Sequence, residues 1–194
     1  MDSDIWLVVG LGNPGANYAG NRHNVGQMVI DVLAHRLGAT FKSHKAGAVV
    51  AEARLVPGGP KLVLAKPGTY MNLSGGPIQQ LAKFFKVQPD HVIVLHDELD
   101  IDFDTVRIKV GGGHGGHNGL RDAIAKIGPD FIRVRIGIGR PPGRMDAADF
   151  VLKDFSSTER AVLSVLLEDA ADAVEAIVRL GVLAAQNTFN TRAR

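Results

Sequence analysis

The sequence predicts an α/β fold built on a largely parallel β-sheet, in a single domain that spans residues 1–194. Two continuous apolar runs, Ile5 to Val9 and Val92 to Leu95, are typical of strands buried on both faces of such a sheet. Segments whose apolar residues recur at helical spacing alternate with the strand-like runs. A length of 194 residues suits one compact domain with a substantial core.

The first apolar run is followed by a helix and then by a pair of strands. Apolar residues recur at helical spacing from Val25 to Leu37, and Gly38 ends the pattern. Residues 49–55 and 62–65 are predicted strands, and the Pro-Gly-Gly-Pro sequence at 57–60 predicts the turn that joins them.

The second half of the chain continues the alternation. Helical spacing of apolar residues predicts helices over residues 78–85 and 120–127. Strict alternation of apolar and polar residues predicts strands over residues 106–110 and 132–138.

Charge is distributed unevenly along the chain, although the net charge is only +2. Residues 107–144 carry eight Lys and Arg against two Asp, whereas residues 145–176 carry eight acidic residues against two basic ones. The acidic stretch overlaps a long helix, which a capping box at Ser156 and Glu159 opens and Gly181 ends. Such an asymmetry suits a polyanionic partner, but ordinary solvated surfaces also produce it.

Four cations follow the alternation of the two strands in the basic region. Arg107 and Lys109 lie between the apolar residues of one strand, and Arg133 and Arg135 lie between those of the other. Because side chains in a strand alternate between faces, all four are expected on non-core faces, where they form a candidate surface patch.

The composition excludes several kinds of chemistry and predicts the compartment. With no cysteine, the protein has no disulfide, no thiolate nucleophile and no cysteine-ligated zinc. The sequence contains no apolar run of the ~20 residues that a membrane helix needs. Asp2 and Asp4 are unlike the basic start of a signal peptide, so we expect a cytoplasmic protein.

The glycine-rich run from Gly10 to Gly15 matches the G-x-G-x-x-G pattern of dinucleotide-binding folds. In that motif the glycines open a helix directly, whereas here Pro14 and a polar run intervene. A tight turn explains the glycines better, but it leaves Asn13 and the polar cluster at residues 21–24 without an explanation.

A histidine and an acidic run provide the residues for base chemistry. His23 precedes the first helix, and His96-Asp97-Glu98-Leu99-Asp100 follows the second apolar run. A carboxylate that accepts one imidazole N–H fixes the tautomer and leaves the other nitrogen free to take a proton from water. A structural histidine, or a metal bound by the same residues, is the alternative at this stage.

Two further segments carry polar residues beside glycines. Ser74 lacks the G-x-S-x-G elbow of serine hydrolases and is expected to cap the following helix. Residues 111–119, Gly-Gly-Gly-His-Gly-Gly-His-Asn-Gly, lack the Lys-Ser/Thr of a P-loop. Glycines there let the backbone approach a ligand closely, and a flexible linker is the alternative.

Six sequence blocks occur in a fixed order between residues 10 and 141, namely GLGNPGxxY, NRHN, KPxTYMNxSG, HDELD, GGGHGGHNGL and RIGIGRP. In content and order these blocks resemble the bacterial peptidyl-tRNA hydrolase family. The resemblance implies a single α/β domain with a twisted mixed sheet flanked by helices. It also implies a cofactor-free and metal-free enzyme that hydrolyses the ester between a peptide and the 3′ ribose of tRNA.

The resemblance also implies roles for individual residues. His23 is similar to the family's general base, and Asp97 to the carboxylate that orients it. The matching amides are Asn13, Asn72 and Asn118, with Tyr18 and Met71 lining the cleft and His117 and Asn118 near the peptide and the terminal nucleotides. Lys109 and Arg135 resemble a clamp for the tRNA 5′ phosphate, with Arg107 and Arg133 as helpers.

Other function classes stay open on the sequence alone. An RNA-binding module without activity uses the same cations, an NAD oxidoreductase uses Gly10 to Gly15, and a metal-dependent hydrolase uses the acidic run. We expect tRNA as the partner and a monomer, because no exposed apolar stripe demands a second chain. Arg107 departs from the Lys of some relatives, which puts little in doubt because both neutralise phosphate.

Overall fold

A seven-stranded mixed sheet forms the centre of the computed structural model, which describes residues 4–192. The extreme ends of the predicted domain, residues 1–3 and 193–194, lie outside the described residues, and Asp2 is among them. The strand order is β2-β3-β4-β1-β5-β7-β6. The strands are β1 (Ile5–Gly10), β2 (Lys42–His44), β3 (Ala48–Arg54), β4 (Lys61–Pro67), β5 (Val92–Glu98), β6 (Val106–Val110) and β7 (Ile132–Gly137).

The four central strands, β4, β1, β5 and β7, are parallel, and the antiparallel pairings lie at the two edges. The α/β class and the mixed sheet are therefore confirmed. The sheet is less parallel than the apolar runs predicted, because three of the six pairings between described strands are antiparallel. One of these is the predicted pair over residues 49–65, whose short connection allows only a hairpin.

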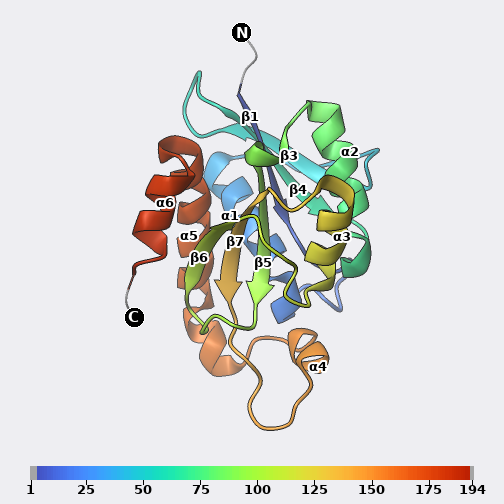
Figure 1. The fold of residues 1–194 in the computed structure, drawn as a ribbon, viewed down its shortest axis with the longest axis vertical. Helices are drawn as coiled ribbons and strands as arrows, with labels where there is room; N and C mark the ends of the chain where they lie inside the picture. The colour runs from blue at the N-terminus through green and yellow to red at the C-terminus, as the bar shows by residue number, and fades with distance from the viewer. Residues whose placement is uncertain (1–3, 193–194) are drawn as a thin grey trace.

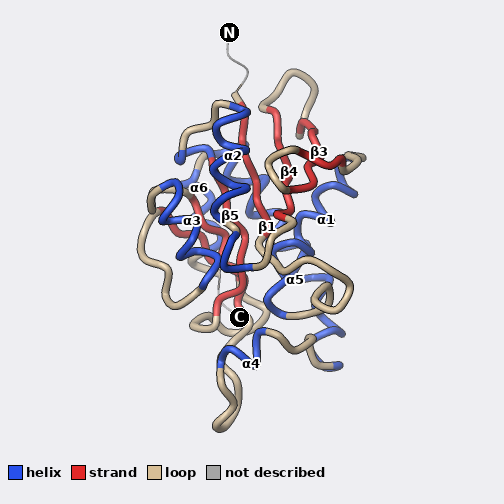
Figure 2. Tube along the Cα trace, turned by 90° about the vertical axis from the view of Figure 1, so that its right-hand side faces the viewer, coloured by secondary structure: helices blue, strands red, loops and turns tan. Residues whose placement is uncertain are grey.

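Helices cover both faces of the sheet (Figure 1). On one face α1 (Val25–Leu37), α5 (Ser157–Leu180) and α6 (Val182–Phe189) pack on Trp6, Val8 and other residues of alternate strand positions. On the other face α2 (Gly75–Phe85) and α3 (Asn118–Ile127) pack on Leu7 and Val9. Figure 2 shows the three layers, with the sheet between α3 and α1.

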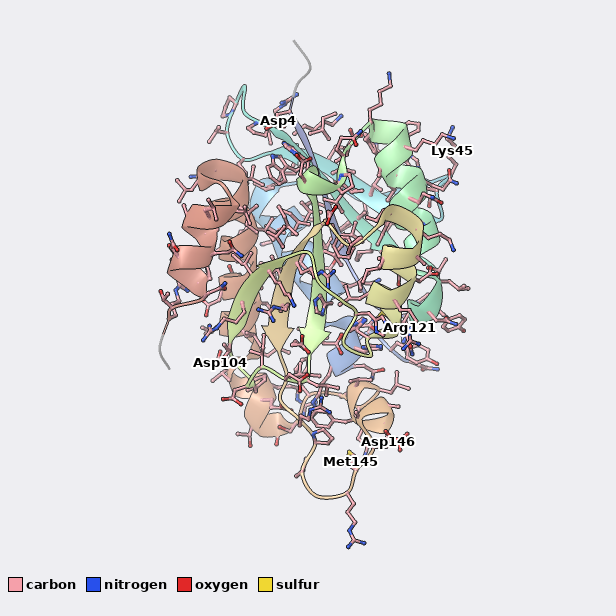
Figure 3. All side chains as sticks on the ribbon, viewed as in Figure 1. Asp4, Lys45, Asp104, Arg121, Met145 and Asp146 are labelled. Carbon is pink, nitrogen blue, oxygen red and sulfur yellow. The ribbon has the colours of Figure 1, made fainter. Side chains whose placement is uncertain are left out.

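Short helices connect the main elements. They are the 3-10 turns η1 (Arg22–Asn24), η2 (Met71–Leu73) and η3 (Pro89–His91), together with α4 (Ala147–Val151). The loop before α4 projects from the body of the molecule, where Met145 and Asp146 are labelled in Figure 3. Neither α4 nor α6 was predicted, because both are short and lack a long apolar period.

Helix caps agree with most of the signals in the sequence. The Ser156 hydroxyl accepts from the Glu159 N–H and the Glu159 carboxylate accepts from the Ser156 N–H, so the predicted capping box is confirmed. Gly38 ends α1 at a φ of 62°. Ser74 occupies the N-cap position of α2, but its side chain makes no cap bond, because its hydroxyl instead donates to the Met71 carbonyl at 2.6 Å. That bond ties Ser74 back into the turn at η2.

Two glycines bring α1 against the sheet and thereby place the residues before it. A β-carbon on Gly26 would lie 2.2 Å from the Leu95 carbonyl oxygen, and one on Gly10 would lie 2.4 Å from the Gly26 carbonyl oxygen. Only glycine permits this approach. The turn η1 is consequently held beside the carboxyl ends of β1 and β5, where ligands bind in open α/β sheets.

Within residues 4–192, no helix is both long enough and apolar enough to cross a membrane.

Candidate active site

A cleft of about 630 Å³ opens at the carboxyl ends of β1 and β5. Its walls come from η1, η2, the start of α3 and the segment around α4. The residues that the sequence analysis assigned to the chemistry or to the cleft all line it: Asn13, Tyr18, His23, Met71, Asn72, Asp97, His117 and Asn118.

Asp97 lines the cleft as a buried residue and bonds to two histidines. Its Oδ2 is 2.8 Å from Nδ1 of His23, and its Oδ1 is 2.8 Å from Nε2 of His117. The carboxylate is 3% exposed, and it belongs to β5, which extends beyond the predicted end at Leu95. A buried carboxylate with both oxygens bonded is held in one orientation.

The tautomer of His117 follows from its position as the N-cap of α3. Its Nδ1 accepts from the backbone N–H of Gly119 at 3.1 Å and of Leu120 at 3.3 Å. That nitrogen carries no proton, so the proton of a neutral His117 is on Nε2 and is donated to Asp97. His117 is therefore a fixed donor to the carboxylate.

His23 is left with one free nitrogen. Since the Asp97 carboxylate accepts from Nδ1–H of His23, the lone pair of the neutral ring is on Nε2. The His23 side chain is 12% exposed and lines the cleft, so this lone pair is accessible from the cleft. The arrangement fits a base that takes a proton from water.

Burial and charge shift the pKa values of His23 and Asp97 in opposite directions. Burial lowers the pKa of His23, but the charge and the hydrogen bond of Asp97 outweigh it, and the pKa is raised above the usual 6.5. Burial raises the pKa of Asp97, but His23 and His117 outweigh it and hold that pKa far below its ordinary value. Asp97 therefore stays ionised and His23 is a stronger base than a free imidazole.

His96 is a neutral buried neighbour of this group. It is 1% exposed, its Nδ1 lies 2.8 Å from the carbonyl oxygen of Asp97, and burial together with His117 lowers its pKa to about 3. Its ring packs edge-on against His117, with ring centroids 5.2 Å apart. His96 thus stays uncharged at neutral pH.

A network of amides fixes Asn13. Asn24 Oδ1 accepts from the Asn13 N–H and Asn24 Nδ2 donates to the Asn13 carbonyl, both at 2.9 Å. The side-chain Oδ1 of Asn13 accepts from the Met71 N–H at 2.7 Å. Because Oδ1 is occupied, the NH₂ group of Asn13 is the part of this side chain available to a ligand.

The remaining amides and aromatic residues lie at the rim of the cleft. Asn72 and Asn118 are exposed, and Asn118 Oδ1 accepts from Arg121 at 3.0 Å. Tyr18 and Tyr70 face each other edge-on, with ring centroids 6.3 Å apart. The rim therefore offers amide donors beside an aromatic surface.

The four strand cations lie outside the cleft but beside it. Pairing of β6 with β7 sets Arg107 opposite Arg135 and Lys109 opposite Arg133, so all four share one face as predicted. Lys109 is exposed and Arg135 is half-buried. The predicted surface patch is wrong for Arg133, which is 2% exposed and bonds to backbone carbonyls.

The guanidinium of Arg107 also bonds to backbone carbonyls. Its Nη1 donates to the carbonyls of Val106 and Phe189 at 3.0 Å, and its Nη2 donates to that of Arg192 at 3.3 Å. The cations that retain accessible charge are therefore Lys109 and Arg135, with Arg107 held against the end of α6.

The geometry bears on both ligands that the sequence left open, a metal ion and a dinucleotide. His23, Asp97 and His117 offer ligand atoms within 4.8 Å of one another. A metal would need the Nε2 lone pair of His117, and the cap on its Nδ1 puts a proton there instead. The run from Gly10 to Gly15 leads into turns, and the next helix of more than one turn begins at Val25, so the glycines present no helix N-terminus to a pyrophosphate.

Some parts of the site were not predicted. The contact between His117 and Asp97 joins residues 20 apart in sequence, and no spacing announces it. Asn24 was noted only within a polar cluster, although its side chain fixes Asn13. Arg140, Val151 and Leu152 complete the far wall of the cleft. The one available signal for Asn24 was its place as the last residue of the NRHN block.

Comparisons with known proteins agree on one family. Residues 7–194 match the sequence profile described as peptidyl-tRNA hydrolase. The chain is 63% identical over 188 residues to the peptidyl-tRNA hydrolase of Leifsonia xyli subsp. xyli (strain CTCB07), covering 96% of this chain and 97% of the relative. It is 61% identical over 190 residues to that of Arthrobacter sp. (strain FB24), covering 97% and 98%.

Solved structures give the same likeness. A crystal structure of peptidyl-tRNA hydrolase from Acinetobacter baumannii is similar at a TM-score of 0.88 and 39% identity, covering 98% of this chain and 97% of that one. A structure of peptidyl-tRNA hydrolase with N-propanol is similar at a TM-score of 0.88 and 39% identity, covering 96% and 95%.

Proposed function

The chain belongs to the peptidyl-tRNA hydrolase family and hydrolyses the ester bond of peptidyl-tRNA, and we propose that His23 is the base for this reaction. The observation that carries the proposal is the 2.8 Å bond from His23 Nδ1 to a buried, ionised Asp97, which leaves Nε2 of His23 open to the cleft.

The reaction proceeds by attack of water on the ester carbonyl. His23 Nε2 takes a proton from the water as its oxygen bonds to the carbonyl carbon, and the imidazolium that forms is stabilised by Asp97. The tetrahedral intermediate then expels the 3′ oxygen of the ribose, which takes the proton from His23. The products are a free peptide carboxylate and tRNA.

An amide donor stabilises the negative charge that develops on the carbonyl oxygen. Asn13 suits this role because its Oδ1 is held by the Met71 N–H and its NH₂ group is available at the cleft. A donor that is fixed before the reaction needs no reorganisation when the charge develops. Asn72 and Asn118 at the rim position the substrate, with Tyr18, Met71 and His117 forming the surrounding wall.

The tRNA phosphates bind the cations beside the cleft. Lys109 and Arg135 provide accessible charge on β6 and β7, and Arg107 supplements them. Arg135 pairs in register with His96, so this charge lies one strand away from the catalytic carboxylate. Phosphate contacts release counterions, and binding therefore weakens as salt increases.

The reaction needs neither a metal nor a second subunit. The proton on His117 Nε2 leaves the histidine–carboxylate cluster without the lone pair that a metal requires. We propose that the protein acts as a monomer, because the residues with a proposed catalytic role line a single cleft within the chain. Peptidyl-tRNA is produced by translating ribosomes, and we therefore place the protein in the cytoplasm.

Hydrolysis of an N-acylated aminoacyl-tRNA in excess EDTA tests the proposal. The wild-type protein is expected to turn over this substrate, and His23→Ala to lose about 10²- to 10⁴-fold in rate. Turnover abolished by EDTA would contradict the metal-free mechanism. Near-normal turnover by His23→Ala would remove His23 as the base, and binding of tRNA without any turnover would indicate an RNA-binding module.

A further inference from the structure

Arg133 is a cation whose charge faces the inside of the protein. It is 2% exposed, and its guanidinium carbon lies 4.7 Å from the centre of the Phe131 ring. Nη1 donates to the Gly113 carbonyl, and Nη2 donates to the carbonyls of Gly112 at 2.6 Å and Pro129 at 3.2 Å. One side chain thus holds two separate loops together.

The loop that Arg133 holds leads directly to the active site. Residues 111–117 connect β6 to α3, and the loop ends at His117, which donates to Asp97. Gly111, Gly112, Gly115 and Gly116 all have positive φ values, between 57° and 101°. Four glycines in such conformations leave the loop with a large conformational entropy when it is free.

Internal bonds restrain only the end of this loop near α3. His114 Nδ1 accepts from the Gly116 N–H at 2.9 Å, and the His114 carbonyl accepts from the His117 N–H at 2.9 Å. Near β6, the Gly111 N–H donates to the Phe131 carbonyl at 3.2 Å. Between these points, the carbonyls of Gly112 and Gly113 are bonded to Arg133.

We propose that Arg133 is a positioning residue that anchors the glycine-rich loop, so that His117 reaches Asp97 and Asn118 reaches the substrate, and that it is not a phosphate ligand. This inference rests on the proposed function, because it assigns the effect of the anchor to the same cleft. A guanidinium is suited to the task, since its planar fork bonds several carbonyls at once.

Lys109 provides a matched contrast on the neighbouring strand. It is the direct cross-strand partner of Arg133 and carries the same charge, but it is exposed. A β-carbon on Gly112 would lie 2.8 Å from the Lys109 ammonium nitrogen, so both cations adjoin the same loop. The phosphate role therefore belongs to Lys109 and the anchoring role to Arg133.

The test compares Arg133→Lys with Lys109→Gln in the full-length protein. Arg133→Lys keeps the charge but cannot span three carbonyls. We expect it to lower kcat by about 10- to 100-fold at saturating substrate, because small displacements of positioned groups have effects of this size. The salt dependence of tRNA binding stays at the wild-type slope, and amide exchange at Gly116 and His117 becomes at least about tenfold faster.

Lys109→Gln is expected to differ in two of these readouts, with a shallower salt slope and unchanged amide exchange in the loop. A shallower salt slope in Arg133→Lys, with kcat and loop exchange unchanged, would overturn the proposal. The two proposals fail in different ways. If the wild-type protein did not hydrolyse its substrate, the proposed function would fail, but amide exchange in the loop could still be measured and would still test the anchoring role.

A measurement on the wild-type protein covers the case in which Arg133→Lys does not fold. The NMR signals of the arginine Nε–H groups are recorded while a tRNA acceptor-stem duplex with a 5′ phosphate is added. The Arg135 signal is expected to shift and the Arg133 signal to stay in place. A phosphate-dependent shift at Arg133 as large as that at Arg135 would contradict the anchoring role.

Discussion

Replacing Asp97 with asparagine tests how the two histidines share one carboxylate. His117 can only donate to this position, because its Nδ1 is occupied by the N–H groups that it caps. The introduced amide must therefore turn its oxygen to His117 and its NH₂ group to Nδ1 of His23. A donor there favours the His23 tautomer with its proton on Nε2, which is the wrong tautomer for a base.

The size of the effect follows from the bonds involved. The productive tautomer of His23 would lose a charge-assisted bond, about 1.5–3 kcal/mol, and would leave two donors facing each other, about 1–3 kcal/mol more. The sum corresponds to a loss of about 10²- to 10⁴-fold in the rate of the chemical step. The pKa of His23 also falls, because the charge that raises it is gone, so the acid limb of the rate profile moves to lower pH.

A second substitution separates the tautomer effect from the loss of charge. His117→Asn keeps a good N-cap residue but cannot reach position 97. In that background the introduced amide is free to turn its oxygen to His23. We therefore expect Asp97→Asn to lower the rate of the chemical step only about 10- to 100-fold. Single-turnover hydrolysis at saturating substrate measures all four members of this cycle. If Asp97→Asn lowered the rate equally in both backgrounds, His117 would not determine how the amide at position 97 is oriented, and the explanation would be refuted.

Three further predictions concern stability and tRNA binding. Burial lowers the pKa of His96 to about 3 in the folded protein, whereas His96 in the unfolded chain takes up a proton as the pH falls below about 6.5. The free energy of unfolding is therefore highest above that pH and falls by about 2 kcal/mol between pH 7 and 5. Urea unfolding at both pH values should show this loss, and His96→Gln should lack it. Glu159→Gln is expected to destabilise the fold by about 2 kcal/mol in the same assay, because it removes the charge 2.6 Å from the buried Arg22 guanidinium. Glu168→Gln, which weakens the exposed ion pair with Arg36, should lower the free energy of unfolding by less than about 1 kcal/mol. An equal loss in the two variants would contradict the greater contribution of the buried pair. Lys109→Gln should reduce the slope of log Kd against log salt by roughly one, and an unchanged slope would exclude a phosphate contact.

Local patterns in the sequence predicted most of the elements and several of the residues that line the cleft. The apolar run at residues 5–9, the helical spacing from Val25 and the capping box at Ser156 each correspond to an observed element. The residues assigned to the chemistry meet in one cleft because β1 and β5 are parallel neighbours and end at the same edge. Local signals were sufficient wherever a few adjacent residues determine the structure.

Long-range packing determines what the sequence did not predict. Alternation correctly placed Arg133 on the sheet face opposite that of Ile132 and Val134, but it could not show that the loop after β6 folds back over that face and buries the side chain. The contact of His117 with Asp97 depends on the same loop. The end of α6 is tied to β6 by Asn190, whose side chain bonds to the backbone of Ile108, 82 residues away in sequence.

The pH dependence of single-turnover hydrolysis tests the central claim most directly. With His23 as the base, the rate rises tenfold per pH unit at low pH and levels off above a pKa that is higher than 6.5, because Asp97 raises it. The residual rate of His23→Asn should lack this transition. A transition that persists in His23→Asn at the same pH would show that another group is the base and would contradict the mechanism.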